Sequence, residues 1–212
     1  MKDVSFKLKN HYTKTFLKHG ANSRGVDWGT DNIRATSRQK KMLEIIRDKP
    51  KDLRERTFLD VGCGYGALAS LLKKLEIKFK YAGVELVEEM IILAKEDHPE
   101  CDFFVGDFLN LTLPKFDYVV CNGILTQKLS ATNTEMNAYA KELINKMFDT
   151  CRVGIAFNVM NTHVTFQSEN LYYRNPVELI AWCISELSPH VRLDCAYDPW
   201  YEYTIFVYKE AA

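Results

Sequence analysis

The stretch FLDVGCGYGAL, residues 58–68, constrains the fold more than any other part of this chain. A short apolar run leads into three glycines at alternate positions, Gly62, Gly64 and Gly66, and a helical pattern follows. Glycines let the backbone turn sharply and approach a neighbouring group closely, which a β-carbon would prevent. A buried strand that passes through such a turn into a helix is typical of a parallel α/β sheet.

The rest of the chain repeats this alternation of strand and helix. The expected strands cover residues 56–62, 79–86, 101–107, 116–123 and 152–160, and the expected helices cover residues 66–76, 87–97 and 134–149. Alternating elements of these lengths predict parallel strands joined by right-handed crossovers. The fold class is therefore α/β, with a doubly wound, Rossmann-like sheet.

The C-terminal part of the chain departs from this pattern. Two further strands are expected at residues 191–197 and 201–209, with only the three residues Asp198–Trp200 between them. A parallel return needs a dozen or more residues, so this pair must be antiparallel. The pattern predicts seven strands, mostly parallel, that end in an antiparallel hairpin.

Length and charge limit the class of protein. The 212 residues fit a single domain, with a helical cap over residues 1–55 and a core over residues 56–212. The 28 basic and 28 acidic residues balance, which argues against a large nucleic-acid or membrane-binding surface. No apolar run reaches the roughly 20 residues of a membrane span, and the N-terminal stretch lacks the apolar part of a secretory signal.

The six cysteines lie mostly in or beside apolar runs and form no C-x-x-C pair. This usage favours reduced thiols in the core of a cytoplasmic protein over disulfides or a zinc site. A homodimer is compatible with this composition.

The acid before the glycine turn, Asp60, indicates the ligand. In a doubly wound sheet the ligand cleft lies outside the carboxyl ends of the strands. A carboxylate there suits a cation better than a pyrophosphate, which binds backbone amides at a helix N-terminus. S-adenosylmethionine (SAM) carries two cations, its α-ammonium and its sulfonium. An NAD-dependent oxidoreductase is the alternative, because the glycines and Ala67 also fit the G-x-G-x-x-A pattern of a dinucleotide site.

The ends of the next strands contribute further side chains to this cleft. Glu85 is placed to accept hydrogen bonds from ribose hydroxyls and Leu86 to pack on adenine, which would serve NAD and SAM alike. Asp107 is placed to accept from the adenine amino group, and Phe108 to offer its backbone amide. This pair is more typical of SAM sites, although a helix cap beside a core aromatic is the plainer alternative. Asn122 follows at the floor of the cleft.

The stretches FLDVGCGYGAL, VEL, GDFLNL and FDYVVCNGIL resemble, in order and spacing, the successive motifs of class I SAM-dependent methyltransferases. The resemblance covers roughly residues 55–209, and the C-terminal hairpin belongs to it. It implies SAM as the cofactor and these cofactor contacts: Asp60, Gly62, Gly64, Glu85, Leu86, Asp107, Phe108 and Asn122. A SAM-binding partner protein without activity is a second alternative.

Methyl transfer from a sulfonium depends mainly on alignment and on the exclusion of water, so it needs no strong catalytic signature. Residues 11–39 are dense in aromatics, glycines and arginines. Within them, Tyr12 is a catalytic candidate that would close over the reacting groups, and Trp28 is a candidate for the acceptor site. Arg38 would bind the cofactor's carboxylate. The alternative is a cap helix with solvated basic residues.

Residues 157–176 follow the fifth strand, and loops at the carboxyl edge of a sheet often carry function. His163 is the candidate general base, which is needed only if the acceptor must lose a proton. Asn161, Tyr172 and Tyr173 are candidates for substrate binding. A surface or structural histidine is the alternative for His163.

Residues after the fourth strand narrow the acceptor. Nucleic-acid amino methyltransferases carry Asn or Asp followed by Pro-Pro-aromatic, whereas Asn122 here precedes Gly123 and Ile124. The stretch CNGIL offers no acids for magnesium, so no metal is expected. The acceptor is therefore expected to be a small molecule methylated at oxygen or nitrogen. A sugar, a sugar phosphate, a capsule-type precursor of polysaccharide biosynthesis and other metabolites are all compatible.

Overall fold

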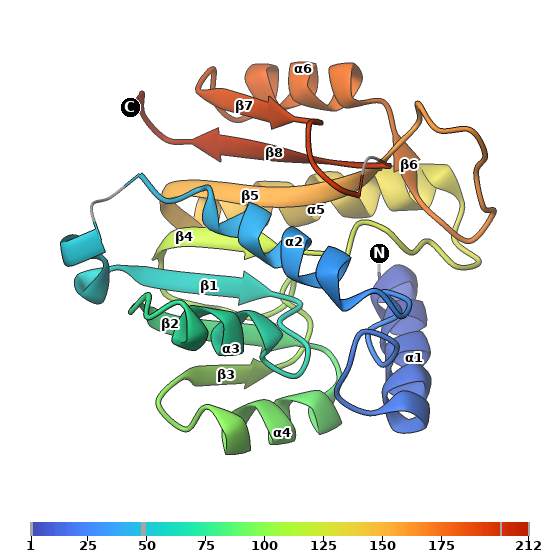
Figure 1. The fold of residues 1–212 in the computed structure, drawn as a ribbon. Helices are drawn as coiled ribbons and strands as arrows, with labels where there is room; N and C mark the ends of the chain where they lie inside the picture. The colour runs from blue at the N-terminus through green and yellow to red at the C-terminus, as the bar shows by residue number, and fades with distance from the viewer. Residues whose placement is uncertain (1, 48–49, 200, 212) are drawn as a thin grey trace.

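A mostly parallel sheet with strand order β3-β2-β1-β4-β5-β8-β7 runs through the protein (Figure 1). The computed structural model describes residues 2–47, 50–199 and 201–211. The strands on this path are β1 (Thr57–Val61), β2 (Lys80–Glu85), β3 (Asp102–Val105), β4 (Phe116–Cys121), β5 (Cys151–Asn161), β7 (Val191–Asp194) and β8 (Glu202–Tyr208). Strands β1 to β5 pair in parallel, and β8 pairs antiparallel with both β5 and β7. The predicted fold class and its seven strands are confirmed.

The C-terminal hairpin is antiparallel as expected, but its strands are shorter than the pattern indicates. Strand β7 ends at Asp194, whose side chain accepts a hydrogen bond from the Ala196 amide at 2.9 Å and so turns the chain. Trp200, in the expected three-residue link, lies outside the described residues. An unpredicted two-residue strand, β6 (Tyr173–Arg174), pairs with β5 away from the main path. Two residues are too few to show a periodic pattern.

Helices cover both faces of the sheet (Figure 1). Helices α1 (Lys2–His19), α5 (Asn133–Thr150) and α6 (Pro176–Glu186) contribute to one hydrophobic cluster, and α2 (Asn32–Leu43), α3 (Ala67–Lys74) and α4 (Glu88–Asp97) to a second. Helices α1 and α4 also share a small third cluster. A short 3-10 helix, η1 (Pro50–Glu55), precedes β1. Helix α1 packs on α5 and lies beyond the carboxyl ends of the parallel strands (Figure 1).

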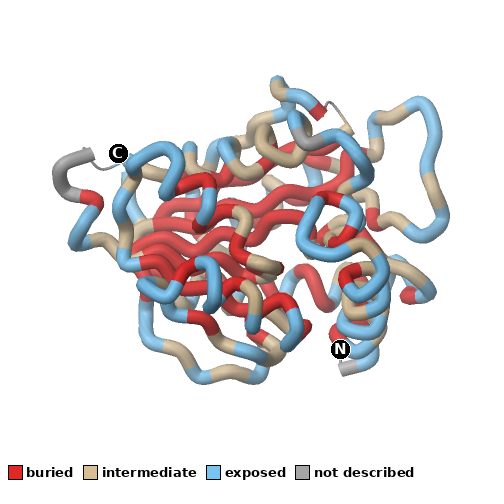
Figure 2. The backbone as a smooth tube through the Cα atoms, turned by 60° about the horizontal axis from the view of Figure 1, so that its bottom comes forward, coloured by how far each residue is buried: buried red, intermediate tan, exposed pale blue. Residues whose placement is uncertain are grey.

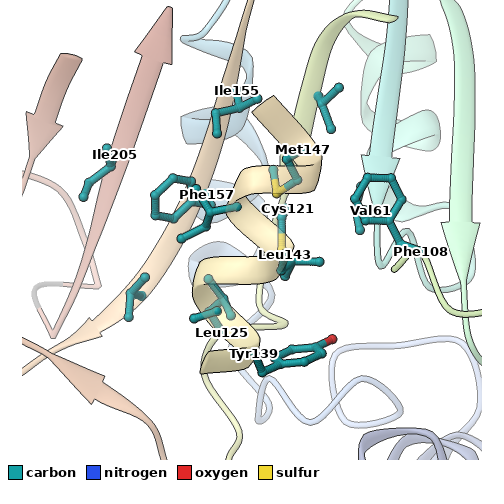
Figure 3. Close-up of a cluster of buried hydrophobic side chains, with 14 of the residues drawn as sticks. Val61, Phe108, Cys121, Leu125, Tyr139, Leu143, Met147, Ile155, Phe157 and Ile205 are labelled. Carbon is teal, nitrogen blue, oxygen red and sulfur yellow. The ribbon is translucent and has the colours of Figure 1, made fainter. Parts of the chain in front are cut away.

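Alternation along the strands divides the core between the two faces. In β1, Leu59 and Val61 belong to the cluster beneath α5, whereas Phe58 belongs to the cluster beneath α3. Figure 3 shows the α5 side, where Leu143 packs near Cys121 at the end of β4. Buried residues follow the strands closely (Figure 2). Because β1 is buried on both faces, a charged side chain at its end is held inside the protein.

Local signals explain where two helices begin. Helix α5 starts after Thr132, whose side chain forms a reciprocal capping box with Glu135. Helix α6, which the sequence pattern did not predict, starts with Pro176 after the capping residue Asn175.

All six cysteines are free thiols, as expected, and four of them are buried. Among the described residues, none of the helices has the length and apolar character that a membrane crossing requires.

Candidate functional site

A pocket lies at the carboxyl ends of the parallel strands, between the glycine turn and the N-terminal helices. Its empty space is about 1040 Å³, solvent at its mouth included. The following predicted site residues line it together: Tyr12, Trp28, Asp60, Gly62, Gly64, Glu85, Leu86, Asp107, Phe108 and Asn122. The structure thus brings together ten side chains or backbone segments that were selected from distant parts of the sequence.

The glycine turn needs its glycines for two separate reasons. Gly62 and Gly64 adopt φ angles of 77° and 55°, a left-handed conformation that side chains disfavour. A β-carbon on Gly62 would also lie 2.6 Å from Cδ1 of Ile124. Glycine is therefore favoured at both positions by the backbone conformation, and at Gly62 also by the closeness of the Ile124 side chain.

Asp60 is a buried acid at the end of β1, with 4% of its surface exposed. The hydroxyl of Tyr81 donates a hydrogen bond to its Oδ2 at 2.8 Å. No lysine, arginine or histidine in the described part of the chain forms an ion pair with it. Burial, reinforced by the nearby Glu85, raises the pKa of Asp60 to about 7 despite the Tyr81 hydrogen bond. A ligand cation would supply the missing counter-charge.

Glu85 is fixed by the backbone around it. Its Oε2 accepts from the Gly64 amide at 3.1 Å, and its Oε1 accepts from the amides of Leu86 at 2.7 Å and Val87 at 3.1 Å. Burial raises the pKa of the carboxyl group, and these amides oppose the rise. The acid therefore connects the glycine turn to the end of β2 and lines the pocket with its orientation already set.

Asp107 and Phe108 combine both readings of their motif. Asp107 caps a turn, because its Oδ1 accepts from the Leu109 amide at 3.0 Å and its Oδ2 accepts from the Asn110 side chain at 3.0 Å. Phe108 is a core aromatic with 4% exposure. Both nevertheless line the pocket, so the cap leaves them available to a ligand.

Asn122 carries a polar atom that needs a partner. The side chain is 8% exposed, and its buried Oδ1 has no hydrogen-bond partner among the described residues. Buried polar oxygens are normally hydrogen-bonded, and exceptions call for an explanation such as a ligand. Since Asn122 lines the pocket, a donor on a bound molecule would satisfy it.

Two aromatic residues come from the N-terminal part of the chain. Trp28 lies directly against Gly123, where an added β-carbon would be 2.7 Å from the indole Nε1. Tyr12 lies on α1, and burial together with the nearby acids Asp27 and Glu85 raises its pKa. At neutral pH Tyr12 is therefore a neutral phenol, whose hydroxyl shares a hydrogen bond with Thr126, and it is unsuited to act as a base.

Arg38 is not among the described residues that line the pocket. This position does not agree with its expected role in binding the cofactor's carboxylate. Its Nε donates to both carboxylate oxygens of Glu202, at 2.8 and 3.0 Å, and its Nη2 donates to the Tyr201 hydroxyl at 3.1 Å. Glu202 lies on a distant part of the sequence and neutralises the guanidinium. Arg38 still reaches the site indirectly, because its guanidinium carbon lies 5.4 Å from the Trp28 ring.

The loop after β5 also lies apart from the pocket. His163 is exposed, and its backbone amide donates to the Asn161 side chain at 2.9 Å. The Tyr172 hydroxyl donates a hydrogen bond to the Asn137 side chain at 2.7 Å. The Tyr173 hydroxyl accepts a hydrogen bond from a backbone amide of the same loop. None of the four predicted residues is among the described residues that line the pocket. Their catalytic and substrate-binding roles stay predictions, and their positions do not support them.

Several lining residues were missed by the sequence analysis. The N-terminal part contributes Leu8, Ser23, Val26, Ala35 and Gln39, and the core contributes Tyr65, Met90, Tyr139 and Leu143 among others. They meet only when α1, α2 and the segment between them fold over the strand ends. A single sequence carries no spacing that marks them.

The positions of side chains that could bind a metal ion bear on the chemistry of the site. Within residues 2–47, 50–199 and 201–211, no group of three His, Cys, Asp or Glu side chains is placed to hold a metal ion.

Comparisons with known proteins agree with this geometry. A family model described as a methyltransferase domain matches residues 58–153. A Mycobacterium tuberculosis (strain H37Rv) protein, named as the methyltransferase Rv1506c, is 30% identical over 155 residues, which cover 71% of this chain and 91% of the relative.

Solved structures share the fold at low identity. Phosphoethanolamine N-methyltransferase 1 of Haemonchus contortus, in complex with phosphoethanolamine and S-adenosylhomocysteine (SAH), has a TM-score of 0.68 and 13% identity. The match covers all of this chain but only 50% of that enzyme, so this chain spans about half of the enzyme's length. The plantazolicin methyltransferase BpumL, in complex with a pentazolic desmethylPZN analog and SAH, has a TM-score of 0.62 and 13% identity, with 99% of this chain and 98% of BpumL covered.

The sheet order, the acid-lined pocket at the strand ends and the match to Rv1506c lead to one conclusion. The chain belongs to the class I SAM-dependent methyltransferases.

Proposed function

We propose that this enzyme transfers the methyl group of SAM to an oxygen or nitrogen atom of a small-molecule acceptor in the pocket at the strand ends. The observation that carries the proposal is Asp60, a buried acid in the pocket with no cationic partner in the described part of the chain. A buried charge without a counter-ion is costly, and a cationic ligand removes that cost.

The lining residues fit the cofactor's parts in turn. Asp60 would hold a cation of the methionyl group, Glu85 would accept from the ribose hydroxyls, and Asp107 would accept from the adenine amino group. Asn122 Oδ1, which lacks a partner, would accept a further hydrogen bond. When bound, SAM supplies an electrophilic methyl group on its sulfonium.

The chain's own residues contribute placement and the exclusion of water. Tyr12 on α1 and Trp28 close the side of the pocket that faces the strand ends. Alignment of two reactants in a closed site accounts for much of the acceleration that such a displacement needs. Tyr12, held as a neutral phenol, would orient a lone pair of the acceptor by donating a hydrogen bond.

A small acceptor agrees with the structural neighbours, which bind phosphoethanolamine in one case and a desmethylPZN analog in the other. Phosphoethanolamine carries a phosphate, and only the small size of the acceptor, not its charge, is carried over to this chain. A sugar or a capsule-type precursor stays a prediction from the sequence. The comparisons offer no specific support for it.

Calorimetry with SAH and with NADH, in parallel on the same protein, tests the cofactor. We expect SAH to bind and NADH not to bind. Asp60→Ala should weaken SAH binding by about tenfold or more, because a hydrogen bond to a charged group contributes about 1.5–3 kcal/mol. Asp97→Ala, an exposed acid outside the pocket, is the matched control and should bind as the wild type does. Tight NADH binding, or unchanged SAH affinity in Asp60→Ala, would contradict the proposal.

A SAM-binding protein without activity would pass the calorimetric test. Release of SAH that depends on an added acceptor separates this alternative from an enzyme.

A further inference from the structure

The charge of the pocket lining narrows the class of acceptor. Three carboxylates, those of Asp60, Glu85 and Asp107, line the pocket, whereas none of the described lining residues is a lysine, arginine or histidine. We propose that the acceptor is a neutral or amine-bearing molecule with an apolar body, and that the site rejects acceptors with a phosphate or carboxylate group. This inference rests on the proposed function and sharpens it.

Three basic residues beside the pocket-lining segments, Arg38, His11 and Lys146, already have partners. Arg38 is paired with Glu202 at 2.6 Å, in contact with the outer side of the Trp28 wall. His11, next to Tyr12 in sequence, has its Nε2 2.8 Å from Asp27 Oδ2. Lys146 donates to two backbone carbonyls of the loop after β3, at 2.9 and 2.7 Å. An anion would have to compete with these interactions. Arg38 Nη1 is buried without a hydrogen-bond partner among the described residues, but Arg38 is not one of the described residues that line the pocket.

Binding of the cofactor does not give the pocket a cation for an anionic acceptor. SAM brings two positive charges and one carboxylate, a net charge of one. The proposed function places the three acids against the cofactor, so the acceptor meets the N-terminal wall, which has no lysine, arginine or histidine among its described lining residues. A phosphate in the same pocket would face carboxylates across a medium that screens charge poorly. Like charges placed together at a binding site discriminate strongly against the wrong partner.

The N-terminal wall of the pocket is largely apolar. Leu8 and Tyr12 come from α1, Val26 and Trp28 from the segment between the helices, and Ala35 from α2. These side chains suit an aliphatic or aromatic body, as lining residues of small-molecule sites commonly do.

Trp28 has two neighbours that fix its position, Gly123 and Arg38. One part of its indole lies against Gly123, and the paired guanidinium of Arg38 lies 5.4 Å from its ring. Ser23 and Gln39 add uncharged polar groups to the same wall. A preformed aromatic wall with neutral hydrogen-bonding groups selects for shape and for uncharged polarity.

The test uses the full chain and three size-matched fragment sets: neutral, cationic and anionic. Binding is followed by the methyl resonances of Val26 and Ile124, which line the pocket, with and without saturating SAH. We expect neutral and cationic fragments to shift these resonances, and anionic fragments to bind about tenfold more weakly or not at all. An equal or stronger response to anions, or no response to any set, would overturn the inference.

A charge placed in the wall gives a second, independent measurement. Gln39→Arg should raise the affinity for the anionic fragments by about tenfold, whereas Gln39→Met, a control of similar length without charge, should not. No gain in Gln39→Arg would contradict the claim that the missing cation sets the selectivity.

These outcomes are separable from those of the proposed function. If SAH fails to bind, the methyltransferase proposal fails, while the fragment response of the free protein still reports the charge selectivity of the pocket. If SAH binds and anionic fragments are preferred, only the present inference fails.

Discussion

Two of the buried acids in the described part of the chain, Glu202 and Asp60, differ in their surroundings. Glu202 on β8 is 1% exposed, receives two hydrogen bonds from Arg38, and accepts from Asn158 Nδ2 at 2.9 Å. Asp60 at the end of β1 is 4% exposed, and the hydrogen bond that the structure gives it comes from the neutral Tyr81 hydroxyl. A buried acid with a full set of partners belongs to the architecture. A buried acid that lacks a counter-ion at a strand end marks a ligand site.

The paired acid still acts on the pocket, through the backbone. Asn158, which donates to Glu202, accepts a hydrogen bond from the Gly123 amide at 2.8 Å. Arg38, on the other side of Glu202, contacts Trp28, which packs on Gly123. The ion pair therefore supports both the turn after β4 and the aromatic that covers it.

The largest effect is expected from removal of the cation of the buried pair. Arg38→Met should lower the free energy of unfolding by about 3–5 kcal/mol, because it leaves Glu202 buried and uncompensated. Urea unfolding monitored by circular dichroism measures this. The double variant Arg38→Met/Glu202→Gln should recover part of the loss. A change below about 1 kcal/mol in the single variant would mean that the pair does not differ from an exposed ion pair.

Substitution of the unpaired acid Asp60 is expected to raise the free energy of unfolding, opposite to the effect of Arg38→Met. The folded-state pKa of Asp60 is raised to about 7, above its ordinary value of 3.8, so its stability contribution is present at low pH and is lost as pH rises through 7. Asp60→Asn removes this cost, and the ligand-free variant should be more stable than the wild type at pH 8 by about 1–3 kcal/mol. Near pH 4 the two proteins should differ little.

Unfolding curves at pH 4, 7 and 8 measure this effect. SAH binding provides the contrast, since the stabilised variant should bind SAH less tightly. A variant that is destabilised at pH 8 would show that Asp60 is a structural acid like Glu202.

The smallest effect is expected at His163, which is exposed and lies apart from the pocket. His163→Ala should change the free energy of unfolding by no more than about 0.5 kcal/mol, as is usual for surface positions. Its SAH affinity should equal that of the wild type. Once an acceptor is known, a large fall in kcat at constant KM would restore His163 as the base and would require the loop after β5 to move.

Prediction from the sequence succeeded for the features that one segment encodes. The stretch from Phe58 to Leu68 predicts a strand, a turn and a helix, because burial periodicity and glycine both act within a few residues. Asp60, Glu85 and Asp107 could be placed in one cleft because parallel strands end at the same edge. Helix α6 was also within reach, since Asn175 and Pro176 are an ordinary helix start.

Prediction did not succeed for Arg38, because its partner comes from a distant part of the sequence. Arg38 was assigned to the cofactor, whereas the structure pairs it with Glu202, 164 residues away. By contrast, the substrate-binding role of Tyr172 stays a prediction, and its hydroxyl donates a hydrogen bond to Asn137 on α5. A residue type states which partners it can accept. It does not state which of these partners lies within hydrogen-bond distance in the folded protein.

The sequence by itself determined the α/β sheet, the glycine turn and the acids at the strand ends, because these follow from local periodicity and from the common edge of parallel strands. Only the tertiary structure decided which charges are paired and which face the pocket. It left Asp60 without a counter-ion, neutralised Arg38 and placed Trp28 and Gln39 in the wall. The physical reason is that the balance of a buried charge depends on all its neighbours at once, and those neighbours come from segments that no local pattern connects.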